Sequence, residues 1–285
     1  MAIALMEPWI QYLCAAALGL IVGSFLNVVI LRLPRRMQHE WEVDARQILG
    51  MEASAAPAPP GVVREHSHCP KCLTPIRWYD NVPVLGYAML RGRCRACGVR
   101  ISPQYPLVEL ATGVATALCV WRFGLTPQAG GAILLTWTLI ALAGIDLRTQ
   151  YLPDKLTLPL LWLGLLGSLW PLLVTPEQAI VGAAAGYLSL WSVYWLFKLL
   201  TGKEGMGYGD FKLLAALGAW FGPASLLPII LLSSVVGALL GSILILAKGR
   251  DAQLPMSFGP YLAAAGFVYM IAGPQLRTLL PIFPG

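Results

Sequence analysis

The chain has 285 residues, of which 57% are hydrophobic and only 12% are charged. Water-soluble domains carry about 25% charged residues, so this composition excludes a soluble globular protein and predicts a chain largely surrounded by lipid. The formal net charge is +6. Because the basic residues lie beside apolar segments, we expect them to contact anionic lipid headgroups and not nucleic acid.

Eight apolar runs predict an all-α polytopic membrane protein with about eight transmembrane helices. A helix needs roughly 20 apolar residues to cross the bilayer core. The run 210–222 is shorter, so we expect a short helix buried among its neighbours there. The first run is long for a signal sequence and no Lys or Arg precedes it, so we expect it to be retained. The runs are 9–31, 105–123, 128–146, 155–173, 178–200, 210–222, 225–247 and 257–273.

The basic residues predict the orientation of these runs. If the N-terminus is outside and all eight runs cross, every one of the 20 Lys and Arg residues except Arg122 and Arg277 falls on one side. Cytoplasmic loops carry such an excess of positive charge. We therefore expect a periplasmic N-terminus and a cytoplasmic location for the long loop that follows the first run.

That loop, residues 32–104, is the only segment long enough to form a subdomain outside the membrane. Three parts are therefore expected: a first span at 1–31, a cytoplasmic domain at 32–104, and a transmembrane bundle at 105–285. Within the loop, the sequence ASAAPAPPG at 53–61 is typical of a flexible or polyproline-like linker.

Four cysteines in the loop form two C-x2-C pairs separated by 21 residues. This spacing is a strong pattern for a tetrahedral zinc site, and four thiolates leave no open position for catalysis, so we expect a structural metal. Disulfides are the alternative, which a reducing cytoplasm disfavours. His66 and His68 flank the first cysteine and offer alternative ligands. The pairs are Cys69 with Cys72 and Cys94 with Cys97.

Four carboxylates lie in or beside the apolar runs, where acids are costly and usually functional: Glu109, Asp146, Asp154 and Asp210. Asp146 ends the third run and Asp210 opens the sixth, so the predicted topology puts both near the cytoplasmic face. Two carboxylates that meet share one proton. The ionised one can then activate water while the protonated one polarises a scissile carbonyl, as in aspartic proteases. The runs contain no histidine, which disfavours a His-activated nucleophile.

Glycines at positions 205, 207 and 209 precede Asp210. Glycine lets the backbone adopt unusual dihedral angles and lets another chain approach closely, which an extended peptide substrate requires. The alternative is a flexible interhelical loop followed by a helix whose first turn carries an acid favoured by the helix dipole. From the residues alone, both interpretations stay open.

Several segments resemble a known family. GIDLRTQYLPD around Asp146 and GMGYGDFKLL around Asp210 resemble the two active-site motifs of type IV prepilin peptidases, which are GxGD membrane aspartyl proteases. GSFLNVVILRLP at 23–34 resembles the first-span motif, and RGRCRACGVRISPQYPLVEL at 91–110 resembles the second cysteine pair and the entry to the second span. The resemblance covers nearly the whole chain and is weakest over 35–65.

The resemblance implies two activities in a bacterial inner membrane. A peptidase removes the leader of type IV prepilins and type II secretion pseudopilins after a glycine. An N-methyltransferase then modifies the new N-terminal residue, usually phenylalanine, with S-adenosylmethionine, and the loop becomes a zinc-binding, methyltransferase-associated domain. The implied residues are Asp146 and Asp210 for catalysis; Gly207, Gly209, Lys212 and Asp154 for support; Gly92 and Arg93 for the methyl donor; and Cys69, Cys72, Cys94 and Cys97 for zinc.

Some of these implied roles compete with simpler interpretations of the residues. Lys212 is close enough in sequence to tune Asp210 electrostatically, but it can equally be a lysine that reaches from a helix end to the membrane interface. Gly92 offers close approach for a cofactor, but it can equally form a turn before the cysteine pair. No G-x-G-x-x-G motif follows a strand, so the sequence predicts no Rossmann-type methyl-donor site.

Two other classes of function fit parts of the sequence. A proton- or ion-coupled transporter also uses glycine-broken helices and intramembrane acids, but it predicts carboxylates near mid-membrane and an internal repeat. A membrane-anchored zinc adaptor gives no reason for two matched aspartate motifs. We therefore predict a leader peptidase and methyltransferase.

Overall fold

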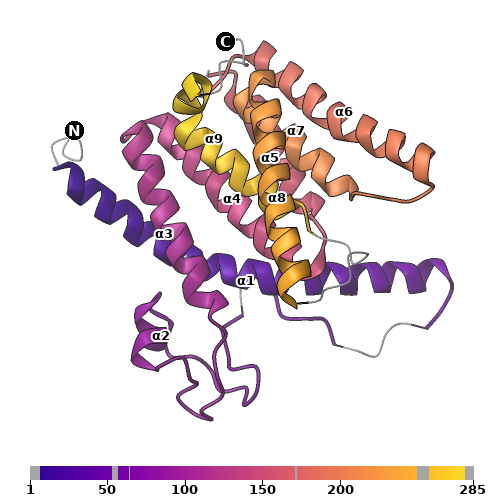
Figure 1. The fold of residues 1–285 in the computed structure, drawn as a ribbon. Coiled ribbons are helices and arrows are strands. Elements are labelled where there is room, and N and C mark those ends of the chain that lie inside the picture. The colour runs from indigo at the N-terminus through magenta and orange to yellow at the C-terminus, as the bar shows by residue number, and fades with distance from the viewer. Residues whose placement is uncertain (1–6, 53–56, 64, 171, 249–256, 280–285) are drawn as a thin grey trace. The chain divides into compact units, whose positions relative to one another are not determined.

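The structure is a computed structural model that describes residues 7–52, 57–63, 65–170, 172–248 and 257–279. The secondary structure of these residues is helical and includes no β-strand (Figure 1). The chain divides into two compact units, Met1–Trp121 and Arg122–Gly285, and each is described by itself. The domain boundaries expected near residues 31 and 104 stay a prediction.

The first unit contains two long helices and a small subdomain between them. Close packing of α1 against α3 requires glycine, because a Cβ at Gly19 would lie 2.7 Å from the Thr112 carbonyl oxygen and one at Gly23 would lie 2.7 Å from Glu109 Cα. The helices are α1 (Pro8–Ile48), the 3-10 helix η2 (Trp78–Asn81), α2 (Leu85–Met89) and α3 (Gln104–Phe123).

Helix α1 continues to Ile48, well past the end of the first predicted span at residue 31. The sequence turns polar at Arg32, but Leu, Met, Gln, Glu and Arg are good helix formers, so the helix persists after its apolar part ends. Pro34 lies inside this helix. The Arg32 guanidinium donates hydrogen bonds to the carbonyls of Gly61 (2.8 Å) and Glu65 (3.0 Å) and so ties α1 to the loop. Residues 53–56 of the predicted linker lie outside the described residues, as does Arg250.

The second unit is a bundle of helices. Two of its helices begin with side-chain caps: Thr126 Oγ1 accepts a hydrogen bond from the Ala129 N–H, and Thr175 forms a reciprocal capping box with Gln178. The helices are α4 (Pro127–Thr149), α5 (Asp154–Gly167), α6 (Pro176–Thr201), α7 (Tyr208–Phe221), the 3-10 helix η3 (Pro223–Ser225), α8 (Leu226–Lys248) and α9 (Gly259–Leu279).

Helix α7 forms the core of this unit, in contact with α5, α6 and α9 (Figure 1). Every residue from Asp210 to Trp220 is buried except Lys212, which agrees with the short buried helix expected at 210–222. A helix that is apolar on all sides is stable only when neighbours surround it. At the crossing of α6 and α7, a Cβ on Gly182 would collide with the Gly218 backbone, so only glycine allows this approach.

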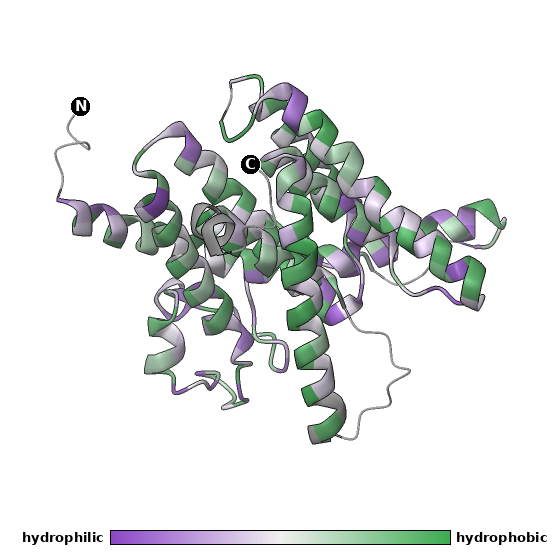
Figure 2. Cartoon of the chain, turned by 45° about the horizontal axis from the view of Figure 1, so that its top comes forward, coloured by the Kyte–Doolittle hydropathy of each residue, from purple (hydrophilic) through white to green (hydrophobic). Residues whose placement is uncertain are grey.

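The chain is a membrane protein, and the part of it that the structure describes contains five helices long and apolar enough to cross a bilayer: α1, α3, α4, α6 and the segment Pro223–Ile243. Each of the eight predicted runs contains a helix, but α5 and α7 have 14 residues each. At a rise of 1.5 Å per residue, each is about 21 Å long and shorter than a bilayer core of ~30 Å. The number of helices that cross therefore stays a prediction. Hydrophobic residues dominate the helices, and hydrophilic residues gather toward helix ends and connecting segments (Figure 2).

Candidate active site and metal centre

Asp146 lies in the last turn of α4, where its side chain is buried. Its Oδ2 accepts a hydrogen bond of 3.0 Å from the backbone N–H of Gly259, the first residue of α9. The Ser257 hydroxyl donates to the Asp146 carbonyl at 2.8 Å. Two hydrogen bonds therefore fix the start of α9 to the end of α4. Glycine is required at 259, because a Cβ there would lie 2.7 Å from Asp146 Oδ2.

Asp210 is the third residue of α7 and is also buried. Gly209 packs against Leu152, and a Cβ at position 209 would lie 2.7 Å from Leu152 Cβ. Gly207 is the N-cap residue of α7, and a Cβ there would meet Asp210 Oδ2 at an ordinary 3.9 Å. The two glycines to which the resemblance gave a supporting role thus differ. A side chain at position 209 would collide with Leu152, whereas position 207 has room for a Cβ atom.

Leu152 connects the surroundings of the two aspartates. Its side chain packs against Gly209, beside Asp210, and against Gly259, where a Cβ would lie 3.1 Å from both Leu152 methyl carbons. The folded second unit therefore links the immediate surroundings of two buried carboxyl groups that are 64 positions apart in sequence.

Lys212 forms an ion pair with Asp154 and joins the start of α5 to the first turns of α7. Its Nζ lies 2.7 Å and 2.8 Å from the two carboxylate oxygens of Asp154. The resemblance implied supporting roles for both residues, and the sequence left open whether Lys212 tunes Asp210 or reaches the membrane interface. The structure pairs it with Asp154 instead, because the turn of α7 that carries Lys212 faces the first turn of α5.

The loop before Asp210 is held by residues that sequence reasoning missed. Lys198 Nζ, near the end of α6, forms an ion pair of 2.8 Å with Glu204 and donates to the Tyr194 hydroxyl at 3.3 Å. The Tyr194 ring lies against those of Tyr208 and Phe211, with centroids 5.2 Å and 5.6 Å away. The aromatic residues alone gave no signal of this cluster, because such residues are common throughout a membrane chain.

In the first unit, the four loop cysteines form one cluster whose sulfur atoms all lie within 4.8 Å of one another. The Sγ atoms of Cys69 and Cys97 are 3.8 Å apart, and those of Cys72 and Cys94 are 4.0 Å apart. A tetrahedron with Zn–S bonds of ~2.3 Å has edges of about 3.8 Å. The four cysteines are free thiols, and their spacing fits a metal ion that joins the two pairs, as the sequence predicted.

Hydrogen bonds also lower the pKa of two of these cysteine thiols. The Thr74 hydroxyl and the Thr74 backbone N–H lower the pKa of Cys72 to about 6. Backbone N–H groups of Cys97 and Ala96 lower the pKa of Cys94. Thiolates are the form that binds metals, so these hydrogen bonds favour the metal-binding form of Cys72 and Cys94.

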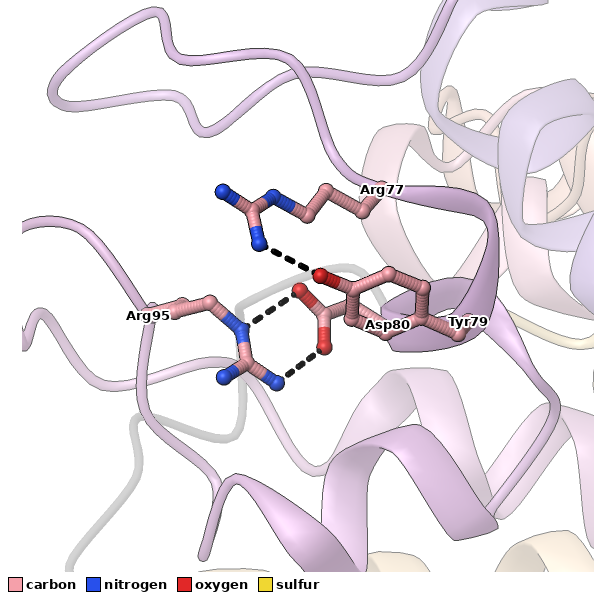
Figure 3. Close-up of polar contacts among 4 residues, drawn as sticks. All are labelled: Arg77, Tyr79, Asp80 and Arg95. Atoms are coloured by element: carbon pink, nitrogen blue, oxygen red, sulfur yellow. Dashed lines mark hydrogen bonds and ion pairs between the residues drawn. The ribbon is translucent and has the colours of Figure 1, made fainter.

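An ionic brace supports the second cysteine pair (Figure 3). Asp80, in η2, accepts hydrogen bonds from Arg95 Nε at 2.9 Å and from Arg95 Nη2 at 2.6 Å. These bonds hold the pKa of Asp80 below its usual value. The Tyr79 ring lies under the Arg95 guanidinium at 5.6 Å, and Arg77 donates a hydrogen bond to the Tyr79 hydroxyl. Since Arg95 lies between Cys94 and Cys97 in the chain, the brace fixes this cysteine pair to η2.

Glu109 connects the subdomain to α3. This carboxylate is buried and accepts a hydrogen bond of 2.7 Å from the Val84 N–H. Val84 has φ +60° and ψ −48°, and the Leu85 N–H donates to the Pro83 carbonyl at 2.6 Å. This is a γ-turn with positive φ, which is strained for a β-branched residue. The sequence marked Glu109 as an unusual acid but gave it no role.

Gly92 and Arg93, predicted near the methyl donor, form the turn before the second cysteine pair. Gly92 has φ +65° and is buried, and a Cβ there would lie 2.8 Å from the Tyr87 hydroxyl oxygen. The Tyr87 ring therefore covers the side of Gly92 to which a Cβ would point. Arg93 is exposed and forms an isolated bridge with Arg100. Gly92 thus occupies the turn that the simpler interpretation offered, Arg93 is accessible, and the methyl-donor site stays a prediction.

Comparisons with known proteins cover both units. Residues 17–123 match the model of the bacterial peptidase A24 N-terminal domain, and residues 133–242 match that of the type IV leader peptidase family. The chain is 56% identical over 270 residues to the prepilin leader peptidase/N-methyltransferase of Xanthomonas campestris pv. campestris, covering 95% of this chain and 94% of that protein.

A relative from a second genus is also similar to the chain over nearly its full length. The chain is 51% identical over 275 residues to the protein of the same name from Pseudomonas aeruginosa, covering 96% of this chain and 95% of that protein. No solved structure matches the chain. Identity of this extent over nearly the full length of both relatives shows that the chain belongs to the type IV leader peptidase family.

Proposed function

We propose that this protein removes the leader peptide of type IV prepilins and type II secretion pseudopilins, and then methylates the new N-terminal residue, usually phenylalanine, with S-adenosylmethionine. The observation that carries this proposal is the similarity to prepilin leader peptidase/N-methyltransferases over 95% of the chain. The buried acids at the end of α4 and the start of α7 support the peptidase activity, and the exposed subdomain gives the second activity a separate location.

The peptidase uses Asp146 and Asp210 as a pair that shares one proton. The ionised carboxylate accepts a proton from water, and the water oxygen attacks the scissile carbonyl carbon. The protonated carboxyl group donates to the carbonyl oxygen, which becomes an alcohol in the tetrahedral intermediate. When the C–N bond breaks, the amine leaves with a proton from the pair. Gly259 supports Asp146 through its N–H, and the Lys212–Asp154 pair positions the start of α7.

The cysteine cluster holds one zinc ion with a structural role. Four sulfur ligands suit zinc and leave no open coordination position. The subdomain between α1 and α3 is too small to build a large core, so the metal supplies much of its folding free energy. The spacing of 3.8 Å and 4.0 Å between opposite sulfur pairs supports this assignment.

The methyl donor binds at the subdomain, near the turn that carries Arg93. S-adenosylmethionine supplies an electrophilic methyl group, and the substrate amine must be unprotonated to accept it. The exposed guanidinium of Arg93 is suited to pair with the carboxylate of the donor's amino-acid portion. Gly92 does not fit a role in direct contact, because the Tyr87 ring covers it.

The protein spans the inner membrane, with its N-terminus in the periplasm and its aspartates and subdomain at the cytoplasmic face. The distribution of Lys and Arg over the loops supports this orientation. The exposed arginines beside the membrane contact anionic lipid headgroups.

Substitution of either aspartate tests the peptidase mechanism. Asp146→Asn and Asp210→Asn are each expected to lower the rate of leader cleavage by at least about 100-fold, the smallest effect usual for general acid–base catalysis. The product mass after incubation with a prepilin and a labelled methyl donor is the measurement. Methyl transfer to a precleaved pilin is the control and should persist. Cleavage at the wild-type rate by either variant would reject the pair.

A further inference from the structure

A cavity of about 260 Å³ opens between α8 and the start of α9. Small residues on α8 form one wall, and two aromatic residues and a serine form the other. The six lining residues are Ser234, Gly237, Ala238, Ser257, Phe258 and Tyr261.

Two lining residues of the cavity immediately precede a residue that contacts Asp146. Ser257 and Phe258 line it, and the next residue, Gly259, donates its N–H to Asp146 Oδ2 at 3.0 Å. Ser257 uses its hydroxyl on the Asp146 carbonyl at 2.8 Å, so this wall is attached to the end of α4. If a scissile carbonyl contacts Asp146, the adjoining substrate residue would lie near Gly259 and therefore near this wall.

The size and chemistry of the cavity fit one large apolar side chain. Small-molecule sites usually measure about 300–1,000 Å³, so 260 Å³ suits a single side chain better than a cofactor. The walls are mostly apolar, and the rings of Phe258 and Tyr261 can pack against an aromatic guest at an edge or a face. Gly237 leaves space that larger residues would fill, because a Cβ there would lie 3.1 Å from the Tyr261 ring.

We propose that this cavity is the specificity subsite for the residue that follows the scissile bond and that it receives a large apolar, preferably aromatic, side chain. The proposal rests on the proposed function, in which that residue is usually phenylalanine. The cavity selects the substrate before cleavage, whereas the two carboxyl groups carry out the reaction.

Filling the cavity from α8 tests the proposal. Ala238→Leu is the main variant, and Ser234→Leu is a second in case the first folds poorly. Val235→Phe is the matched control, because Val235 is exposed on α8 but does not line the cavity. Each purified full-length protein is assayed for kcat and KM on two prepilins that differ only in having phenylalanine or alanine after the scissile bond.

The wild type should favour the phenylalanine substrate about 10-fold or more in kcat/KM, as expected for a large apolar group in a fitted pocket. Ala238→Leu and Ser234→Leu should raise KM for the phenylalanine substrate more than for the alanine substrate, so that most of the preference is lost. Val235→Phe should keep the preference.

Two outcomes would overturn the subsite. One is an equal loss for both substrates in the filling variants, which is expected if a lipid chain occupies the cavity. The other is an unchanged preference in a folded filling variant. Failure of the proposed function looks different: the wild type would cleave neither substrate, or Asp146→Asn would retain cleavage.

Discussion

Gly259 and Gly209 both pack against Leu152. Gly259 contacts the Asp146 carboxylate, and Gly209 precedes Asp210 in the chain. A side chain at position 259 would meet the Asp146 carboxylate at 2.7 Å, and one at position 209 would meet Leu152 Cβ at 2.7 Å. At the residue scale, the positions of the two aspartates therefore depend on the absence of a side chain at residues 209 and 259.

Gly259→Ala should displace the Asp146 carboxylate and weaken its hydrogen bond from the backbone N–H. Misplacement of a reacting group by about 1 Å can cost ~100-fold in rate, so we expect a fall in leader cleavage of that order. Initial cleavage rates of the purified variant measure this effect. Gly130→Ala is the matched control, because a Cβ there has nothing within 4 Å. Wild-type cleavage by Gly259→Ala would show that this contact does not hold Asp146 in place.

Lys212→Met and Asp154→Asn test whether Lys212 acts through Asp154 or directly on Asp210. The pair is partly exposed, with 29% and 45% of the side chains accessible, so each substitution should cost less than about 1 kcal/mol of stability. Both variants should lower kcat to a similar degree, and the double variant should be no worse than either single one. The pH–rate profile should keep its midpoints. A shifted profile in Lys212→Met alone would instead support direct tuning of Asp210.

At the element scale, contacts between helices determine which helix is buried and which helices are its neighbours, and hydropathy does not specify those neighbours. Helix α7 has 14 residues, too few to span a bilayer on its own, yet nearly all of it is buried by α5, α6 and α9. The sequence predicted its existence and its burial. It did not predict the glycine contact between Gly182 and Gly218, because the partner of a small residue cannot be read from spacing along one helix.

The junction of α2 with α3 offers a second test at this scale. Glu109→Ala removes the acceptor for the Val84 N–H and should cost about 1–3 kcal/mol, the usual cost of an unpaired buried polar group. Val84→Gly should be nearly neutral or slightly stabilising, because glycine adopts positive φ without strain. Thermal unfolding of the detergent-solubilised protein measures both.

Glu109→Ala is expected to lower the stability of the protein, whereas Val84→Gly is expected to leave it unchanged or raise it slightly. If Val84→Gly destabilises the protein as much as Glu109→Ala does, the valine side chain matters more than the strained turn. If Glu109→Ala leaves the unfolding midpoint unchanged, the hydrogen bond does not hold the subdomain on α3.

At the scale of the whole molecule, the proposed function assigns the two activities to separate units. The first contains the cysteine cluster and matches the peptidase A24 N-terminal domain, and the second contains both buried aspartates and matches the leader peptidase family over 133–242. This division gives each activity its own folded support, so damage to one unit should affect one activity first.

Removal of the metal is therefore expected to unfold the subdomain and abolish methyl transfer. Cys94→Ser, or treatment with a strong chelator, should lower the zinc content from one ion per chain to near zero and expose residues 66–102 to protease. Elemental analysis and limited proteolysis measure these effects. Cys14→Ser is the control, because Cys14 lies outside the cluster. Full zinc content in Cys94→Ser would contradict the four-cysteine site.

The sequence by itself determined the membrane class, the eight apolar runs, the cysteine quartet and the two aspartates, because composition, hydrophobic length and ligand spacing are local properties of a chain. Only the tertiary structure decided which residues these groups meet: Gly259 for Asp146, Leu152 between the glycines, Asp154 for Lys212, Val84 for Glu109 and Arg95 for Asp80. Such contacts join residues far apart in the chain, and the packing of helices fixes them, since no period or motif along the sequence specifies which helices become neighbours.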